Sequence, residues 1–421
     1  MSDNDSNNSQ INISRRNFLK TSLAVTAGLM ASQSAHIYAQ GSDTIKLGLV
    51  GTGSRGTGAV IDCFNSSEGH RAELTAVAEL FTDRVESSLK KIREEGYGDK
   101  VKVTGDTTFY GFDAYKDLLE TDVDIVMLAT PPHFRPTMLR AAIEADKHVF
   151  AEKPFGVDPV GTRTIFDTAD LADEKGLSII VGTQQRRQYH YLEIMDRIRD
   201  GQIGEIRGGQ IYWNWGFQDW HLNPRQPEWS DMEWQIRNWP YFVWLSGDHY
   251  VEQHFHNVDI MNWAMGGPPE RAMGLGGRQS RTEEKYGNIW DHFTVELQYA
   301  GDKRVMSMAS QINGTTSRVG ERIVGAKGST WTTRGEGNIE GENPWVFDGE
   351  MISGMEKEHA DLIRSIIDDK PINEARRAAE TNLTMIMGRI SAYTGRAVQY
   401  SWIRDASKLD LSPESYEMGD M

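Results

Sequence analysis

The feature that most constrains the fold is an apolar run, Ile45–Val50, that leads directly into the glycine pattern Gly51-Thr-Gly53-Ser-Arg-Gly56. The residues that follow, 57 to about 65, have a helical pattern. A strand, a tight glycine turn and a helix in this order are typical of the first unit of a parallel α/β sheet. Gly51 permits the turn, Gly53 lets a ligand approach the backbone, and Gly56 lets the helix pack closely on the strand.

The same turn predicts a dinucleotide site. Free N–H groups at the start of the helix, around Ser54 and Arg55, attract phosphate groups. In such domains a carboxylate at the end of the second strand holds the ribose hydroxyls. Glu79 ends the apolar segment 74–79 and lies 23 residues after Gly56, which argues against a glycine-rich loop without a ligand. Glu79 favours NAD because a carboxylate repels a 2′-phosphate, while Arg55 in the loop leaves NADP open.

Strand and helix patterns alternate through the first third of the chain, which predicts a Rossmann domain over residues 41–182. The ligand crevice of such a sheet lies at the carboxyl ends of its strands, where Thr130, Pro131, His133, Glu152 and Lys153 stand. The expected strands are 45–50, 74–80, 124–129, 148–151 and 178–182, and the expected helices are 83–95, 113–120, 136–146 and 159–175.

Beyond residue 204 the pattern becomes one of alternating, half-buried strands. It predicts a second α/β domain over residues 183–421, with an open, largely antiparallel sheet. The expected strands are 205–215, 270–275, 291–299, 303–312 and 318–325. Two helices are expected near the end, 356–368 and 374–394, with Asn373 as the N-cap of the second.

Residues 1–40 are predicted to be a twin-arginine export signal and linker. Arg15-Arg16 is followed by Phe-Leu-Lys and by a weakly apolar run, 21–35, which is too short and too polar for a permanent membrane anchor. Small residues around Ala39 suit a signal peptidase. The alternative is a disordered tail that contains Arg-Arg. The twin-arginine machinery exports folded proteins, so we expect a periplasmic protein that carries a tightly bound nucleotide, since dinucleotides are scarce outside the cytoplasm.

Charge and cysteine content narrow the classes of partner. The formal net charge is −16, which disfavours nucleic acids and anionic membrane surfaces as partners. The single cysteine, Cys63, excludes a disulfide within the chain, and a small buried thiol is the expected role for it.

The residues suited to chemistry fall in two places. Lys153 ends a strand that faces the crevice, where an ammonium can contact a substrate oxygen. The segment 247–263 contains three histidines and reads as a helix on which Glu252 and His256 share a face, with His249 and Gln253 beside them. Such a histidine suits proton exchange with a hydroxyl. A metal on His249, Glu252 or Gln253, and His256 is the weaker alternative, and we expect none.

Seven of the 12 tryptophans lie between residues 213 and 244. Indole faces stack on the C–H faces of sugars, which makes Trp213 and Trp215 candidates for substrate binding. Packing of a long loop or a subunit contact is the alternative for this cluster.

The chain resembles the glucose–fructose oxidoreductase/inositol dehydrogenase/MocA (Gfo/Idh/MocA) family over nearly all of its length after the signal. The motifs that carry the resemblance are the glycine loop 48–56, Ala151-Glu-Lys-Pro154, Gly182-Thr-Gln-Gln-Arg-Arg187, Gly201–Ile206 and His256-Asn-Val-Asp259 to Gly266. The resemblance implies Lys153 as a catalytic or substrate-orienting residue, His256 as acid/base, and a homo-oligomer. Substrate binding and oligomerisation by the second domain are implied only by this resemblance. Family dehydrogenases usually have Asp where this chain has Glu252. Arg186 is expected to contact the substrate.

These observations favour an NAD(P)-dependent oxidoreductase acting on a sugar or a sugar-derived polyol. His256 would take the hydroxyl proton as a hydride leaves the same carbon, and Lys153 would position that oxygen. A second reading is a glycoside-cleaving enzyme that oxidises its substrate transiently, eliminates the leaving group and then restores its bound NAD. A third is a non-catalytic carbohydrate-binding protein with a bound nucleotide.

Overall fold

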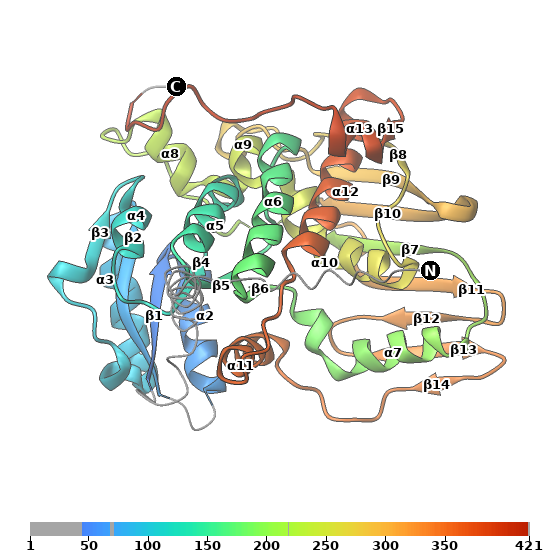
Figure 1. The fold of residues 1–421 in the computed structure, drawn as a ribbon. Helices are drawn as coiled ribbons and strands as arrows, with labels where there is room; N and C mark the ends of the chain where they lie inside the picture. The colour runs from blue at the N-terminus through green and yellow to red at the C-terminus, as the bar shows by residue number, and fades with distance from the viewer. Residues whose placement is uncertain (1–43, 68–70, 218, 420–421) are drawn as a thin grey trace, which may run out of the picture. The chain divides into compact units, whose positions relative to one another are not determined.

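The computed structural model describes residues 44–67, 71–217 and 219–419, so the predicted export signal lies outside the described residues. The first part of the described chain forms a six-stranded sheet in the order β3-β2-β1-β4-β5-β6 (Figure 1). All of its strand pairs are parallel. This is the predicted Rossmann sheet, and its strands are β1 (Thr44–Val50), β2 (Arg71–Glu79), β3 (Thr108–Tyr110), β4 (Ile125–Leu128), β5 (His148–Ala151) and β6 (Ile179–Val181).

Helices cover both faces of this sheet. Alternate residues of a strand therefore pack against different sets of helices. In β4, Ile125 and Met127 pack in one core with helices α2 (Ser54–Ser66) and α3 (Thr82–Ile92). Val126 and Leu128 belong to a second core that contains α4 (Ala114–Leu119), α5 (Arg135–Glu144) and α6 (Pro159–Lys175). Successive side chains of a strand point to opposite faces, so a run of apolar residues is buried on both sides.

A second, nine-stranded sheet has the order β14-β13-β12-β11-β7-β10-β9-β8-β15. Only the β7–β10 pair is parallel among the pairs described, so the sheet is mixed and largely antiparallel, as expected. Its strands are β7 (Ile206–Trp215), β8 (Arg271–Gly277), β9 (His292–Tyr299), β10 (Lys303–Gln311), β11 (Arg318–Gly325), β12 (Gly328–Thr332), β13 (Gly337–Gly341), β14 (Trp345–Val346) and β15 (Val398–Gln399).

The strands that sequence patterns missed are short. β3, β14 and β15 have three residues or fewer, and β12 and β13 are rich in Gly and polar residues that lack a clear alternation. These strands exist because their backbones complete sheet edges, which is a tertiary effect. The remaining helices are α7 (Tyr189–Arg199), α8 (Asp231–Arg237), α9 (Val243–Ser246) and α13 (Tyr400–Asp405).

Helix α10 (Asp248–Met265) is polar in composition and yet buried. Fifteen consecutive residues, 248 to 262, are buried between the second sheet and helix α12 (Ala375–Thr394). Several of its polar groups have partners: Asp248 accepts hydrogen bonds from the Trp290 amide (3.0 Å) and the Tyr393 hydroxyl (2.5 Å). Buried polar groups need such partners, so α10 is held in one orientation.

The last two long helices return to the first sheet. Helix α11 (Gly354–Ile367) packs against α2, and α12 lies along α6 (Figure 1). The expected cap of α12 is one residue early, because the N-cap is Glu374, although the Asn373 side chain accepts a hydrogen bond from the Ala375 amide (3.1 Å). The domain boundary at residue 182 stays a prediction, since both sheets share these helices.

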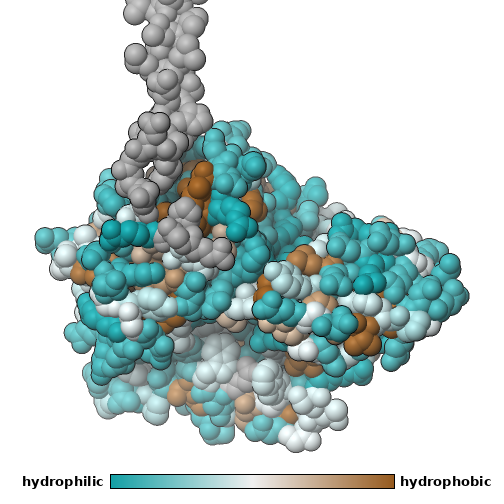
Figure 2. Space-filling view, turned by 90° about the horizontal axis from the view of Figure 1, so that it is seen from below, coloured by the Kyte–Doolittle hydropathy of each residue, from teal (hydrophilic) through white to brown (hydrophobic). Residues whose placement is uncertain are grey.

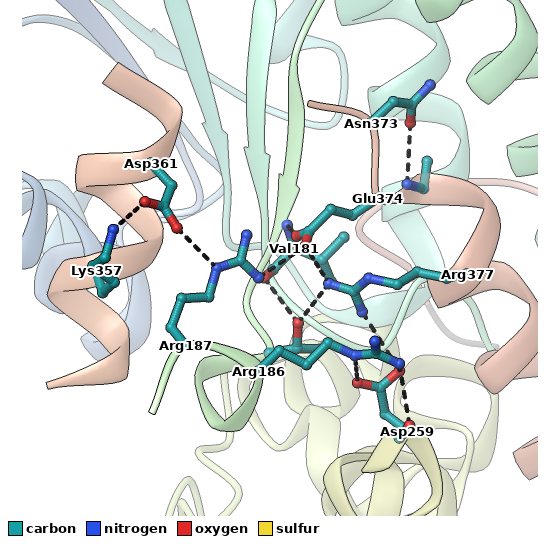
Figure 3. Close-up of polar contacts among 11 residues, drawn as sticks. Val181, Arg186, Arg187, Asp259, Lys357, Asp361, Asn373, Glu374 and Arg377 are labelled. Carbon is teal, nitrogen blue, oxygen red and sulfur yellow. Dashed lines mark hydrogen bonds and ion pairs between the residues drawn. The ribbon is translucent and has the colours of Figure 1, made fainter. Parts of the chain in front are cut away.

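A network of alternating charges joins the end of β6 to helices α10, α11 and α12 (Figure 3). Asp259 of α10 accepts from Arg186 (2.5 Å) and lies 3.4 Å from Arg377 of α12. Glu374 pairs with Arg377 (2.6 Å) and with Arg187 (2.8 Å). The neighbouring guanidinium groups hold the pKa of Asp259 below its usual range against the effect of burial. The network fixes how α10 and α12 meet the first sheet.

The described part of the chain shows no large apolar patch on the face that Figure 2 draws. The face drawn in Figure 2 is largely hydrophilic, with hydrophobic residues in small, separate groups. Among the described residues, no helix is long and apolar enough to cross a bilayer. Oligomerisation through the second domain stays a prediction.

Replacing Asp259 should destabilise the protein strongly. In Asp259→Asn the positive charges of Arg186 and Arg377 lose their buried counter-charge, and breaking such a buried pair costs about 3–5 kcal/mol. Chemical unfolding of the mature protein measures this. The control is Glu296→Gln, which breaks the exposed pair with Arg304 (2.7 Å) and should cost at most about 1 kcal/mol. Equal effects of the two variants would contradict the role assigned to the network.

Candidate active site

The glycine turn fits a dinucleotide. Gly51 has φ +91°, and a Cβ there would lie 2.8 Å from the Thr130 amide nitrogen. A Cβ on Gly56 would lie 2.0 Å from the Gly51 carbonyl oxygen, so the close packing of α2 on β1 requires glycine. A Cβ on Gly53 meets no atom within 4 Å, so that side of the loop is open to a ligand. Packing within the protein therefore requires glycine at positions 51 and 56. At position 53 it does not, and a glycine there leaves room for a ligand.

Glu79 closes one side of this crevice. Its carboxylate accepts hydrogen bonds from the backbone N–H of Thr52 (2.7 Å) and of Leu80 (2.7 Å), which fix it at the end of β2. A fixed carboxylate that lines the crevice is the expected partner of ribose hydroxyls. The other predicted cofactor residues that line the same crevice are Gly51, Gly53, Ser54, Arg55, Thr130 and Pro131.

Residues of the second half of the chain roof the crevice. His221, Ile236 and Trp239, from the loop and helix α8 that follow β7, line it opposite the glycine turn. Arg237 ties this roof to α3 through Asp83 (3.1 Å). The sequence did not indicate these residues as cofactor contacts.

His133 lies outside the set that lines the crevice. Its Nε2 is 2.7 Å from the Tyr416 hydroxyl, and its ring packs beside Phe134 and Trp244. Burial lowers the pKa of His133 to about 4. The C-terminal segment covers this histidine, which the sequence could not show because Tyr416 is 283 residues away along the chain.

A second cavity adjoins the crevice, with Arg55 in the wall of both. It gathers Lys153 from the end of β5 and Glu252, Gln253 and His256 from α10. Glu152, Trp213 and Trp215, also predicted, lie in its wall. The structure therefore brings together residues that lie about 100 positions apart in the sequence.

Two ion pairs organise this cavity. Lys153 Nζ donates to Glu252 Oε1 (2.6 Å) and to the Glu252 carbonyl oxygen, and both side chains are nearly buried. Arg55 Nε lies 2.7 Å from Glu152 Oε1, and its Nη2 donates to Asp62 (2.8 Å). The guanidinium of Arg55 is thus paired with Glu152 in the cavity wall and with Asp62 of α2.

His256 stands in the cavity as a neutral base. Burial, and then the charges of Lys153 and Arg334, hold the pKa of His256 well below its usual range. Its ring is stacked on Trp213 with centroids 6.2 Å apart, and Nδ1 is buried without a partner among the described residues. Glu252, one turn earlier on α10, directs its carboxylate to Lys153 instead of His256.

Two predicted substrate residues lie elsewhere. His249 is buried in a small separate cavity with Arg281 and Gln311, where burial lowers its pKa to about 3. Arg186 is bound in the charge network through Asp259 and covers the Trp263 ring at 4.7 Å. His249 and His256 share a helical face, but they are two turns apart, about 10 Å along the axis, so His249 reaches another cavity that Gln253 also lines.

The cavity also holds residues that the sequence did not single out: Gln184, Trp220, Arg334, Met355 and Glu358. Glu358 is 1% exposed, and burial raises its pKa well above the usual range. Gln184 belongs to the Gly182–Arg187 motif, so the sequence could have indicated it as a residue of this cavity. Arg334 and Glu358 come from a hairpin and from α11, whose approach only the fold determines. Within the described ranges no group of three or more His, Cys, Asp or Glu side chains has a metal-binding arrangement.

Comparison with known proteins identifies the class. Residues 45–183 match the family model of Gfo/Idh/MocA oxidoreductases with an NAD-binding Rossmann fold, and residues 191–330 match the C-terminal domain of the same family. The chain belongs to the Gfo/Idh/MocA oxidoreductase family, and its first domain is an NAD-binding Rossmann fold. Residues 12–32 match the twin-arginine signal, which directs export to the periplasm.

Relatives with curated names match only in part. A glycosyl hydrolase family 109 protein of Shewanella sp. (strain W3-18-1) is 28% identical over 219 residues, and an α-N-acetylgalactosaminidase of Shewanella oneidensis is 27% identical over 219 residues. Each alignment covers 47% of this chain and 45% of the relative, so the chain spans about half the length of these relatives.

Solved structures share the fold at low identity. An oxidoreductase domain protein from Kribbella flavida has a TM-score of 0.68, and an aldose–aldose oxidoreductase from Caulobacter crescentus has 0.66. A scyllo-inositol dehydrogenase from Lactobacillus casei, solved with NAD(H) and scyllo-inositol, has 0.63. Each is 17% identical and covers 85% of this chain and 99% of its own. At this identity the likeness shows the fold alone.

Two glycine variants separate folding from cofactor binding. Gly56→Ala should lower stability by at least about 2 kcal/mol, because its Cβ would overlap the Gly51 carbonyl oxygen. Gly53→Ala should leave the melting temperature of the cofactor-free protein unchanged and weaken NAD binding more than about tenfold. Thermal unfolding and calorimetric titration with NAD measure the two effects. Normal NAD affinity in Gly53→Ala would show that the nucleotide does not approach this loop.

Proposed function

We propose that this protein is a periplasmic NAD-dependent oxidoreductase of a sugar or a sugar-derived polyol, with Lys153 and His256 acting on the reacting hydroxyl. The observation that carries the proposal is the position of these two side chains in a cavity that shares the Arg55 wall with the dinucleotide crevice. A substrate in the cavity would lie beside the cofactor.

The glycine turn and the Glu79 carboxylate suit the crevice to NAD. Its phosphates would lie on the open side of Gly53 at the start of α2, and its ribose against the fixed carboxylate of Glu79. Glu79 supports NAD over NADP, and the charge of Arg55 is paired with Glu152 and Asp62. When bound, NAD supplies hydride acceptance and hydride return at its nicotinamide ring.

His256 would take the proton of the substrate hydroxyl. A base must be unprotonated to do so, and the depressed pKa of His256 keeps its imidazole neutral near pH 7. Lys153 would hold the same oxygen and stabilise negative charge on it, with Glu252 fixing the ammonium in place. The low exposure of all three side chains strengthens these interactions because electrostatic attraction is screened less away from water.

The tryptophans would form the walls for the sugar ring. Trp213, Trp215 and Trp220 line the cavity, and the first two have ring centroids 6.4 Å apart. Gln253, whose Oε1 accepts a hydrogen bond from Gln311 Nε2 (2.7 Å), also lines the cavity. This arrangement matches a ligand with apolar C–H faces and a polar rim, which describes a pyranose or a cyclitol.

We expect NAD to remain bound after purification. The roof formed by His221, Ile236 and Trp239 covers the crevice, and release requires this roof to move. Mature protein taken from the periplasm, dialysed and then denatured should release a stoichiometric amount of NAD. The variant Trp239→Ala should lose NAD during dialysis, whereas Trp402→Ala, an exposed tryptophan of α13, should retain it. A wild-type supernatant without nucleotide would contradict this expectation.

Single-turnover reduction of the bound NAD tests the chemistry. His256→Asn and Lys153→Met should each slow hydride transfer from a reactive sugar by about 10²-fold or more. Lys153→Met should also raise the pKa of His256, because removing a nearby cation favours the imidazolium, so activity should fall at a higher pH on the acid side. NADH absorbance at several pH values measures both effects. Unchanged rates in both variants would favour a non-catalytic binding protein.

Glycoside cleavage with restored NAD is the second candidate, favoured by the Shewanella relatives that are named glycosidases. Release of phenol from aryl glycosides without net NADH would support it over the dehydrogenase. In that reaction His256 and Lys153 would serve the same initial oxidation, so the His256→Asn variant should lose both activities. Net NADH formation in proportion to substrate would support the dehydrogenase.

A further inference from the structure

The positive and negative side chains in the wall of the second cavity, where the proposed sugar would bind, do not all form pairs. The wall contains two ion pairs, Lys153 with Glu252 (2.6 Å) and Arg55 with Glu152 (2.7 Å), and Arg55 also pairs with Asp62 (2.8 Å), which lies outside the wall. Arg334 and Glu358 remain as the other ionisable groups of the wall apart from His256, which is a neutral base. The charge of the cavity therefore depends on these two side chains.

Arg334 is fixed in position by the hairpin that carries it. The turn between β12 and β13 is closed by a hydrogen bond from the Thr333 amide to the Glu336 carbonyl oxygen (2.9 Å), and His190 Nε2 lies 2.9 Å from the Thr333 carbonyl oxygen. The guanidinium lies over the Trp213 ring, 5.3 Å from its centroid. Trp213 is in turn stacked on His256, so the cation stands at the reacting end of the cavity.

No carboxylate neutralises this cation in the part of the chain that the structure describes, where the Arg334 side chain has neither an ion pair nor a hydrogen bond. The carboxylate of Glu336, two residues on, accepts from Trp331 Nε1 (3.1 Å). Behind Arg334, Glu321 accepts from Asn257 (2.5 Å) and Tyr191 (3.1 Å), and burial raises its pKa to about 8.

Glu358 does not compensate either. It is buried on α11, where Arg187 and Arg55 favour its ionised form while Glu152 and Glu374 oppose it. Burial outweighs these charges and raises its pKa well above the usual range, which disfavours its charged form. The wall therefore carries one unbalanced positive charge, on Arg334.

We propose that the substrate of this site is a sugar that carries a carboxylate, and that Arg334 binds the carboxylate while the sugar ring packs against the tryptophans. This inference rests on the proposed sugar site. The planar guanidinium matches a carboxylate with two parallel hydrogen bonds, and the partly desolvated setting strengthens them. Trp213 Nε1 is a buried donor without a partner among the described residues and stands beside the same position. Arg334 is thus the specificity-determining residue.

Matched pairs of sugars test the proposal. Calorimetric titration of the NAD-loaded mature protein compares D-glucuronic acid with D-glucose, and D-galacturonic acid with D-galactose. Wild type should bind the acid of at least one pair about tenfold more tightly or better. Arg334→Gln should erase that preference while leaving the neutral sugar within about threefold, and Arg334→Lys should restore part of it. Added salt should weaken the acid alone.

The control variant is Arg318→Gln. Arg318 is an exposed arginine of the same sheet that also covers aromatic rings, Tyr212 and Trp331, but it lies outside the cavity lining. It should leave all four affinities unchanged. A glucose 6-sulfate titration distinguishes anions, since tighter binding of the sulfate than of either uronic acid would overturn the carboxylate assignment.

The outcome separates this proposal from the proposed reaction. Preferential binding of a uronic acid that depends on Arg334, without reduction of bound NAD, would uphold the assignment of Arg334 and contradict the oxidoreductase role. Reduction of NAD by neutral sugars with equal rates in wild type and Arg334→Gln, without a preference for the acids, would uphold the oxidoreductase role and contradict the assignment of Arg334. Equal loss of acid and neutral sugar binding in Arg334→Gln would overturn the proposal, because it would indicate a structural role for the side chain.

Discussion

The ion pair between Lys153 and Glu252 is the contact on which the rest of the site depends. Lys153 ends a strand of the parallel sheet, and Glu252 belongs to the helix that lies on the second sheet. The pair therefore joins the parallel sheet to helix α10 in the wall of the cavity that also contains His256. The longer Glu side chain, where family dehydrogenases usually have Asp, reaches the lysine ammonium and leaves His256 free of a carboxylate partner.

Desolvation sets the charge state of nearly every group around that pair. It keeps His256 unprotonated and disfavours the charged forms of Glu321 and Glu358, whereas an arginine stays charged even when its pKa is lowered. The same physical effect thus prepares a base and leaves Arg334 as a cation without a counter-charge. The proposed reaction and the proposed preference for an acidic sugar share this origin.

Sequence patterns predicted the parallel sheet well because its strands are apolar on both faces and alternate with helices of strong periodicity; the bounds 148–151 and 159–175 are reproduced without change. They also predicted Lys153, Glu252 and His256 as neighbours. They misplaced His249, His133 and Arg186 because periodicity gives the face of a helix and not what covers it. Tyr416, Gln253 and Asp259 occupy those positions, and only packing brings them there.

The sequence by itself determined the cofactor class, since a glycine turn and its distant carboxylate act through local backbone geometry, and it predicted Lys153 and His256 as the reacting side chains. The tertiary structure decided which charges are paired and which are not, because pairing depends on approach between segments such as the β12–β13 hairpin, α11 and the end of β5. Burial, which sets the protonation of each group, is likewise a property of the folded chain and of no segment alone.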